Sequence, residues 1–565
     1  MLASGFLLLA IAPQGVPAQP WLDAARSAAE RSVVLKLDDA LAADARDGVL
    51  LGVAPEVAAV AQRLGGLAVE RYFTQSPAEL AELRLRGLGR GAWPPPPDLS
   101  LYFRVSTETP AAAAALAEEL RRLPGVAYAY VAPAPADPPT DIPPVTPDWT
   151  QFQDYFEAPT RGTRQYALAG FLGARGRNVR VTDCEYAWVY DHEDIELNAG
   201  RLVGGTPVGL FSDHGTAVLG QLYAQDNDYG VTGGVPQCEM YMATEYATQF
   251  GFNPTQAIIN AALSSQAGDV ILLEMQTSGP TGAYVPEEWT QASFDAIQSA
   301  TAAGIHVVEA GGNGGMNLDS AVFGGAFDVT VRDSRAVIVG AGSAMDHISL
   351  WFTSRGSRVD CQGWGESVYT AGYGNLFQAG SDDRQDYTSN FSGTSSASPI
   401  VTSAVVALQG AMEAHGMTPP TPLQLRDALR VTGTPQPPLN AAMGRIGPLP
   451  DLEALFDWFG LPQGLRHGPR AVLGGLFTLE LSGNPSESWT LYRALDTALT
   501  PTPQGMRVLG SNHFASVASG SLSAAGTATY TTQVPNRSGL AGREAYLQAL
   551  FGSARWSNGG AVTLE

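Results

Sequence analysis

Four polar residues of the chain have the types and the settings that acyl transfer requires. Ser395 lies in residues 393–399 (GTSSASP), where a glycine turn leads into an apolar helix rich in small residues. The first turn of a helix has free backbone N–H groups and a positive dipole, so it suits a nucleophile and the charge that its attack creates. Alone, the segment is equally consistent with a buried helix start that has no chemistry.

The other three residues, Asp183, His214 and Asn313, lie at the ends of predicted elements. Asp183 follows a predicted strand at residues 178–182, and His214 lies in the first turn of a predicted helix that begins at Ser212. Asn313 follows a predicted strand at residues 305–310. Open α/β sheets build their sites where strands end and helices begin. Strands alternate with helices over residues 148–460, which predicts an α/β domain with a doubly wound, mostly parallel sheet.

These motifs together resemble the subtilisin-like serine peptidases (subtilases, family S8). The order Asp, His, Ser is the subtilisin order, and the resemblance covers about residues 178–451. It implies a serine-type endopeptidase, a hydrolase with protein or peptide substrates. Ser395 would attack the peptide carbonyl, His214 would be its base, Asp183 would orient His214, and Asn313 would donate to the oxyanion.

Part of the substrate site departs from the family pattern. Glu274-Met275-Gln276 stands where relatives have the Ser-Leu-Gly strand that pairs with the substrate backbone, so the resemblance implies substrate contacts there and at Gly311 and Gly312. Two interpretations of Glu274 stay open. It favours a basic residue at the cleavage point, or it faces inward to a partner in the protein.

A structural calcium site is a further expectation from the resemblance. Residues 223–233 resemble a calcium loop of relatives, with Asn227 in the loop and Asp194 as a second ligand. Carboxylate, amide and backbone oxygens are the ligands that calcium takes. An ordinary polar loop is the equal alternative, and no organic cofactor is implied.

The N-terminal part predicts a leader and a pro-region. Residues 1–18 hold an apolar run followed by small residues, which is typical of a cleaved signal peptide, although no basic residue precedes the run. Residues 19–131 predict a small α/β module, and residues 132–147 a proline-rich linker. The resemblance implies that the module is a pro-region of a zymogen that inhibits the enzyme until it is cleaved. A stable, uncleaved binding domain is the alternative.

The C-terminal part has a different pattern. Apolar and polar residues alternate over residues 465–565, with Gly, Pro, Asn and Ser between the runs, which predicts a β-sandwich. It shows no catalytic pattern. Attachment, sorting and substrate contact are equally open as its role.

Composition limits the partners. The net charge is −22, so phosphate-backbone binding is excluded as a main activity because there is no basic surplus. Beyond residues 1–18 no apolar run is long enough for a membrane span, so we expect a secreted protein with no membrane anchor after signal removal. The three cysteines suggest free thiols. A catalytically silent subtilisin fold that acts as a binding protein is the alternative function, and a transpeptidase is a third.

Overall fold

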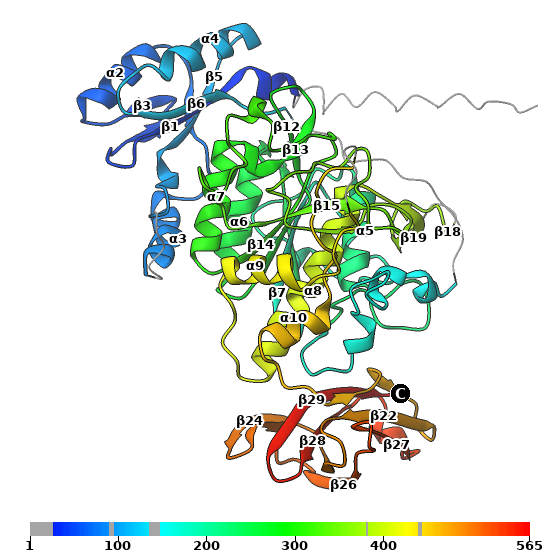
Figure 1. Ribbon diagram of the computed structural model, residues 1–565. Coiled ribbons are helices and arrows are strands. Elements are labelled where there is room, and N and C mark those ends of the chain that lie inside the picture. Colours follow the sequence, from blue (N-terminus) through cyan, green and yellow to red (C-terminus); the bar gives the residue numbers. More distant parts are fainter. Residues whose placement is uncertain (1–25, 90–94, 135–146, 380–381, 439–442) are drawn as a thin grey trace, which may run out of the picture.

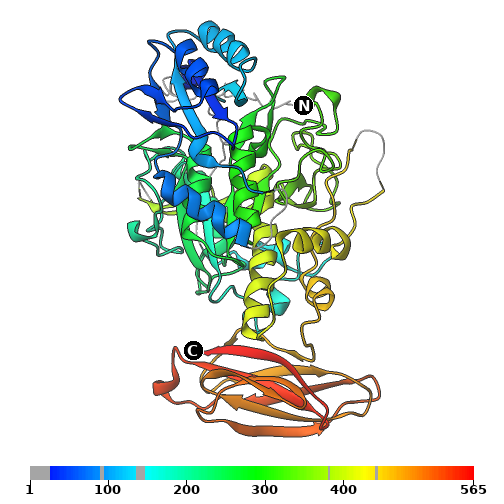
Figure 2. The same cartoon turned by 90° about the vertical axis from the view of Figure 1, so that its left-hand side faces the viewer.

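The computed structural model describes residues 26–89, 95–134, 147–379, 382–438 and 443–565. The predicted signal at residues 1–18 and most of the predicted linker at 132–147 lie outside these described residues. The chain forms three units in a row, with an N-terminal module at one end, a central α/β domain, and a C-terminal β domain at the other end (Figure 1). Figure 2 shows the same order from the side.

A six-stranded sheet forms the centre of the α/β domain. Its order is β16-β15-β14-β11-β7-β8, and every neighbouring pair is parallel. The strands are β7 (Arg180–Glu185), β8 (Glu239–Thr244), β11 (Val270–Leu273), β14 (His306–Ala310), β15 (Val337–Gly342) and β16 (Cys361–Trp364). Parallel sheets are covered on both faces, which explains why their strands read as apolar runs. The predicted parallel sheet is confirmed.

Helices cover the two faces of this sheet. One face is covered by α5 (Ser212–Tyr223) and α8 (Thr394–Ala414), and the other by α6 (Pro254–Ser264) and α7 (Gln291–Ala302) (Figure 1). Alternate residues of β11 point to opposite faces, as the strand period requires. Val270 and Leu272 join the core beneath α8, whereas Ile271 and Leu273 join the core beneath α6 and α7. The α/β domain continues through α9 (Pro422–Thr432) and α10 (Leu452–Trp458).

The N-terminal module is an antiparallel sheet covered by helices. Its four strands lie in the order β4-β5-β1-β6, and β2 and β3 form a separate hairpin. The elements are β1 (Ser32–Leu37), β2 (Asp44–Arg46), β3 (Val49–Leu51), α2 (Pro55–Arg63), β4 (Val69–Arg71), α3 (Pro77–Gly89), β5 (Tyr102–Ser106), α4 (Pro110–Leu120) and β6 (Val126–Val131). Helices α2 and α4 share the apolar core of this sheet, while α3 packs against α7 of the central domain.

The C-terminal domain consists of two facing sheets and a hairpin. One sheet has the order β20-β22-β27, the other has the order β21-β29-β28-β23-β26, and β24 pairs with β25. The strands are β20 (Leu465–Arg466), β21 (Arg470–Ala471), β22 (Leu476–Ser482), β23 (Ser488–Ala494), β24 (Thr497–Thr502), β25 (Gly505–Leu509), β26 (Ala515–Ser521), β27 (Thr527–Gln533), β28 (Glu544–Phe551) and β29 (Arg555–Leu564). One apolar core joins the two sheets.

Two further observations concern the described residues as a set. None of their helices has both the length and the apolar character needed to cross a bilayer. Cys184, Cys238 and Cys361 are all buried and free, as the sequence suggested.

Candidate active site

Ser395 is the second residue of α8, the most deeply buried helix of the central domain. Gly393 precedes the helix with a φ of 99°, a conformation that residues with a side chain rarely adopt. The helix is buried without interruption from Thr394 to Met412, and Ser395 itself is 5% exposed. The sequence therefore delivers this hydroxyl to the first turn of a helix whose position is fixed by packing on all sides.

His214 lies in the first turn of α5 and contacts a carboxylate. Its Nδ1 forms a hydrogen bond with Oε1 of Glu185, the last residue of β7. Both side chains are 1% exposed. His214 Nε2 is buried and has no hydrogen-bond partner among the described residues, so one ring nitrogen is held while the other is available to a reacting group.

The carboxylate on His214 is not the one that the sequence predicted. Asp183 is also fully buried, but its Oδ2 accepts a hydrogen bond of 2.7 Å from Trp188 Nε1. Its Oδ1 has no partner among the described residues. The expectation that Asp183 orients His214 was therefore wrong, and the structure gives that position to Glu185.

The length of β7 explains the difference. The apolar pattern predicted a strand that ends at Thr182, with Asp183 as the first residue beyond the sheet, but the strand continues to Glu185. Residues i and i+2 of a strand point to the same face and lie about 7 Å apart. Asp183 and Glu185 therefore face the same way, and only Glu185 is at the strand end, beside the helix start that carries His214.

Asn313 is anchored in a way that leaves its amide nitrogen available. Its Oδ1 accepts hydrogen bonds from Thr394 N at 2.9 Å and from Thr394 Oγ1 at 3.1 Å. Its own backbone N–H donates to Gln276 Oε1 at 2.9 Å. Asn313 Nδ2 is buried and has no partner among the described residues. An unpaired, fixed donor next to the residue before Ser395 is the arrangement that stabilises an oxyanion.

Two neighbouring residues support this donor, and the sequence analysis did not assign them that role. Thr394 Oγ1 accepts from the backbone N–H of Gly312 at 3.1 Å while its hydroxyl donates to Asn313. Gly312 has a φ of 83°, and a Cβ there would lie 2.7 Å from the backbone of Val285. The glycine thus allows the chain to pass close to β13 (Tyr284–Pro286), and its N–H and Thr394 fix the turn that carries Asn313.

The three residues after β11 have three different surroundings. Glu274 is 6% exposed and its Oε1 lies 2.5 Å from Ser398 Oγ. Met275 is 2% exposed and belongs to the core beneath α6 and α7. Gln276 begins β12 (Gln276–Ser278), which pairs with β13, and its side chain contacts Asn313. The side chains of Glu274 and Met275 both point into the protein, whereas the expected contacts of these two residues with the substrate backbone stay a prediction.

Substrate contacts at Gln276, Gly311 and Gly312 stay a prediction. Gly311 and Gly312 are buried, and the backbone N–H of Gly311 donates to Val339 O at 2.9 Å. Of the two interpretations of Glu274, the inward one is confirmed by its contact with Ser398.

Carboxyl groups gather at this end of the sheet. Burial and the neighbouring Glu185 raise the pKa of Asp183 well above its usual range. Burial likewise raises the pKa of Glu274, although its bond to Ser398 opposes the shift. Burial also raises the pKa of Glu245, the residue after β8, with Glu185 adding to the effect. Burial thus favours the neutral form of these three carboxyl groups, which lie around the Glu185 side chain that contacts His214.

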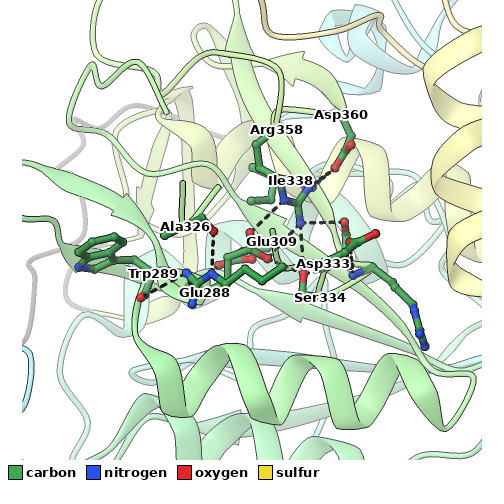
Figure 3. Close-up of polar contacts among 12 residues, drawn as sticks. Glu288, Trp289, Glu309, Ala326, Asp333, Ser334, Ile338, Arg358 and Asp360 are labelled. Carbon is green, nitrogen blue, oxygen red and sulfur yellow. Dashed lines mark hydrogen bonds and ion pairs between the residues drawn. The ribbon is translucent and has the colours of Figure 1, made fainter. Parts of the chain in front are cut away.

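A second buried polar cluster surrounds Arg358 and includes Glu309 of β14, the strand that precedes Asn313 (Figure 3). Arg358 forms two bonds to Glu288, of 2.9 and 3.0 Å, and one of 2.7 Å to Asp360. Glu309 in β14 accepts from the backbone N–H of Glu288 at 2.8 Å. Although burial opposes the charged form, the carboxylates hold the pKa of Arg358 above its usual value. The cluster connects β14 with β15 and with the residues just before α7. These connections help to position the turn that carries Asn313.

The predicted calcium ligands contact each other. Asn227 Nδ2 donates to Asp194 Oδ1 at 2.7 Å, and Val231 N donates to Asp194 Oδ2 at 2.9 Å. Burial raises the pKa of Asp194 to about 7. Oxygens that face N–H donors do not fit a cation, and no group of three or more His, Cys, Asp or Glu suited to a metal occurs in the described part of the chain. Calcium at this loop stays a prediction, without support from this arrangement.

Comparison with known protein families finds a match to part of the chain. Residues 190–444 match the model of the Subtilase family (Peptidase_S8). The matched range includes His214, Asn313 and Ser395 and begins after Asp183 and Glu185. The predicted resemblance to the subtilisin-like peptidases is confirmed for this part of the chain.

The chain is also similar to individual subtilisins. Subtilisin E of Bacillus subtilis (strain 168) is 26% identical over 265 residues, which are 46% of this chain and 62% of that protein. Subtilisin of Bacillus pumilus is 27% identical over 265 residues, with 46% of this chain and 86% of that protein covered. The chain thus spans less than two thirds of subtilisin E. Fervidolysin from Fervidobacterium pennivorans has a TM-score of 0.46 at 15% identity, over 92% of this chain and 70% of that one.

Proposed function

We propose that this protein, whose residues 190–444 form a subtilase-family domain, is a serine endopeptidase with Ser395, His214 and Glu185 as its triad. The observation that carries the proposal is the state of His214 in the structure. One nitrogen is held by Glu185, and the other is buried without a partner among the described residues. Helix α5, which carries His214, packs against α8, which carries Ser395. A general base needs this combination, a carboxylate on one ring nitrogen and a second nitrogen free to take a proton.

The proposed reaction uses each group in turn. Ser395 Oγ attacks the carbonyl carbon of the scissile peptide while His214 Nε2 takes its proton. The carbonyl electrons move to oxygen, where Asn313 Nδ2 and the Ser395 backbone N–H stabilise the negative charge. His214 then gives its proton to the leaving amine. Water hydrolyses the resulting ester by the same route, and Glu185 stabilises the charged imidazole in both halves.

We further propose that the N-terminal module is an inhibitory pro-region. Its contacts with the two helices on one face of the sheet support this role. Thr74 N donates to Gln256 in α6 at 2.8 Å, and Ala292 N in α7 donates to Tyr130 OH at 3.0 Å. Tyr102 OH also donates to Asp295 in α7. A module that binds the folded domain through side chains of both helices has the contacts that an inhibitor needs.

Secretion belongs to the same proposal. The apolar run in residues 2–18 suits an export signal, and a secreted peptidase would be made as a zymogen so that it does not act inside the cell. The C-terminal β domain packs against the central domain through Leu172, whose N–H donates to Gly559 O at 2.9 Å, and we assign it no catalytic part.

Fluorophosphonate labelling of the purified full-length protein, with intact-mass analysis beside Ser395→Ala, tests the function. We expect the wild type to be labelled at Ser395 and to be shortened near residues 132–148, and the variant to stay unlabelled and full length. A wild-type chain that is shortened but never labelled would contradict the peptidase and favour a silent binding protein. Labelling without shortening would contradict the pro-region alone.

A further inference from the structure

Glu274 is a buried carboxyl group beside the proposed nucleophile that the reaction does not use. It follows the last residue of β11, and its backbone N–H donates to Cys184 O in β7 at 3.2 Å. Strand alternation turns its side chain to the same face as Leu272, toward α8. There its Oε1 contacts Ser398, while its Oε2 is buried without a partner among the described residues. The Ser395 hydroxyl is near enough to lower its pKa slightly against the effect of burial.

The two close contacts of the Ser398 hydroxyl favour one protonation form of Glu274. Ser398 Oγ lies 2.5 Å from Glu274 Oε1 and 2.7 Å from the carbonyl oxygen of Thr394. A serine hydroxyl has one proton, and a carbonyl can only accept. If Ser398 donates to Thr394 O, the proton between Ser398 and Glu274 must come from the carboxyl group. Glu274 is then a neutral acid that donates to Ser398.

The groups around Glu274 favour the same form. From β7, Asp183 and Glu185 face it, and burial above all, followed by the charge of Glu185, raises its pKa. From α8 it meets the hydroxyls of Ser395 and Ser398, and the thiol of Cys184 beside it is itself held neutral by burial.

Two more titratable groups lie on the adjoining elements. His214 in α5 is bound to Glu185. In β14 the residue paired with Leu273 is Glu309, whose carboxyl group faces Glu288 and the Arg358 cluster (Figure 3). His214 and Arg358, the two basic groups named here, therefore both contact carboxylates other than Glu274.

We infer that Glu274 is a positioning residue that holds the first turns of α8, and with them Ser395, as a neutral acid, and that its ionisation sets an alkaline limit to catalysis. The inference rests on the proposed peptidase function. Loss of the proton to solvent would remove the bond that Glu274 donates to Ser398. It would also put a second negative charge next to Ser395, where the tetrahedral intermediate already carries one.

Steady-state kinetics of the processed enzyme from about pH 5 to about pH 10 test this role, with kcat and KM measured separately. For the wild type we expect kcat to fall on the alkaline side while KM changes little. Glu274→Gln keeps a donor for Ser398 and cannot ionise, so its alkaline fall should disappear. Glu274→Leu loses the donor, and its kcat should be about 10-fold below that of Glu274→Gln at every pH.

Asp183→Asn is the matched control, because Asp183 is the other neutral acid on this face. It should keep the alkaline fall. The inference would be overturned if kcat of Glu274→Gln fell at alkaline pH as it does in the wild type. It would also be overturned if Glu274→Leu and Glu274→Gln had equal kcat values. Fluorophosphonate titration of the same samples distinguishes failure of the proposed peptidase function from failure of the proposed role of Glu274. A wild type that neither labels nor hydrolyses peptides at any pH contradicts the function itself, whereas an active wild type with no alkaline fall contradicts only the role of Glu274.

Discussion

At the scale of residues, the site depends on donors and acceptors that are held on one side and open on the other. His214 is held at Nδ1 and open at Nε2, and Asn313 is held at Oδ1 and open at Nδ2. An open buried polar group costs free energy in the resting protein. It repays that cost only when a reacting atom arrives, which is the logic of a site built for the transition state.

The first prediction concerns Asn313 as the oxyanion donor. Asn313→Ala should lower kcat by about 10²–10³-fold with little change in KM, because the donor acts on charge that exists only in the transition state. Thr394→Val is the matched variant, since it removes the hydroxyl that donates to Asn313 Oδ1 but leaves the amide in place, and its loss should be smaller. Equal kcat values for wild type and Asn313→Ala would contradict the assignment.

Three of the four proposed catalytic positions could be predicted from the sequence. His214, Asn313 and Ser395 each lie next to a helix start or a glycine-rich turn, so local sequence fixes their setting. The carboxylate could not be fixed in this way, because Asp183 and Glu185 share a face of β7 and only the true end of the strand distinguishes them. A strand end depends on pairing with β8 and β11, which the local sequence does not specify.

At the scale of elements, the expected order of strands and helices is largely confirmed. Strand β6 at residues 126–131 and the helices that begin at Pro55 and Pro110 belong to the small α/β module that the sequence predicted for residues 19–131. In both helices proline occupies the first turn, which is a strong local signal. Helix α3 was not predicted. Its buried residues Leu80 and Leu83 pack against α7 of another unit, so its stability comes from a contact that is distant in sequence.

The second prediction concerns the Arg358 cluster, which ties elements together. Arg358→Met should lower the free energy of unfolding by about 3–5 kcal/mol, because it leaves Glu288 and Asp360 buried without their cation. Arg63→Met is the control. Arg63 pairs with Glu119 on the surface, where both side chains are more than 40% exposed, and its loss should cost less than about 1 kcal/mol. Chemical denaturation of both variants, each made in the full-length Ser395→Ala protein, measures these losses. Equal losses of unfolding free energy in Arg358→Met and Arg63→Met would contradict the structural role of the Arg358 cluster.

At the scale of the whole molecule, buried ionisable groups determine how stability depends on pH. Burial raises the pKa of Glu245 and Glu274 well above their usual range, and that of Glu287 to about 7. These groups are neutral in the folded protein at a pH where they are ionised in the unfolded chain. The folded state then binds more protons, so stability falls as pH rises from the unfolded pKa through the folded pKa.

Buried histidines act in the opposite direction over a lower range. Burial lowers the pKa of His306 and of His415 to about 4, so their contribution to stability rises with pH up to the ordinary histidine value and is then constant.

The third prediction follows from this balance. Above about pH 6.5 the histidine contribution is complete, and only the carboxyl groups with still higher pKa values continue to act. We expect the Tm of Ser395→Ala to fall between about pH 6.5 and about pH 9. Glu245→Gln should reduce that slope by up to about 1.4 kcal/mol of unfolding free energy per pH unit. A Tm that rises over this range, measured by calorimetry, would contradict the neutral state of these groups.

The central claim is that Glu185, and not Asp183, completes the triad, and kcat of two amide variants tests it most directly. Glu185→Gln should lower kcat by about 10⁴-fold, as loss of a triad carboxylate does. Asp183→Asn replaces a neutral acid that accepts from Trp188 with an amide that can still accept, so its kcat should stay within about 10-fold of wild type. The opposite result, with Asp183→Asn inactive and Glu185→Gln active, would contradict the account.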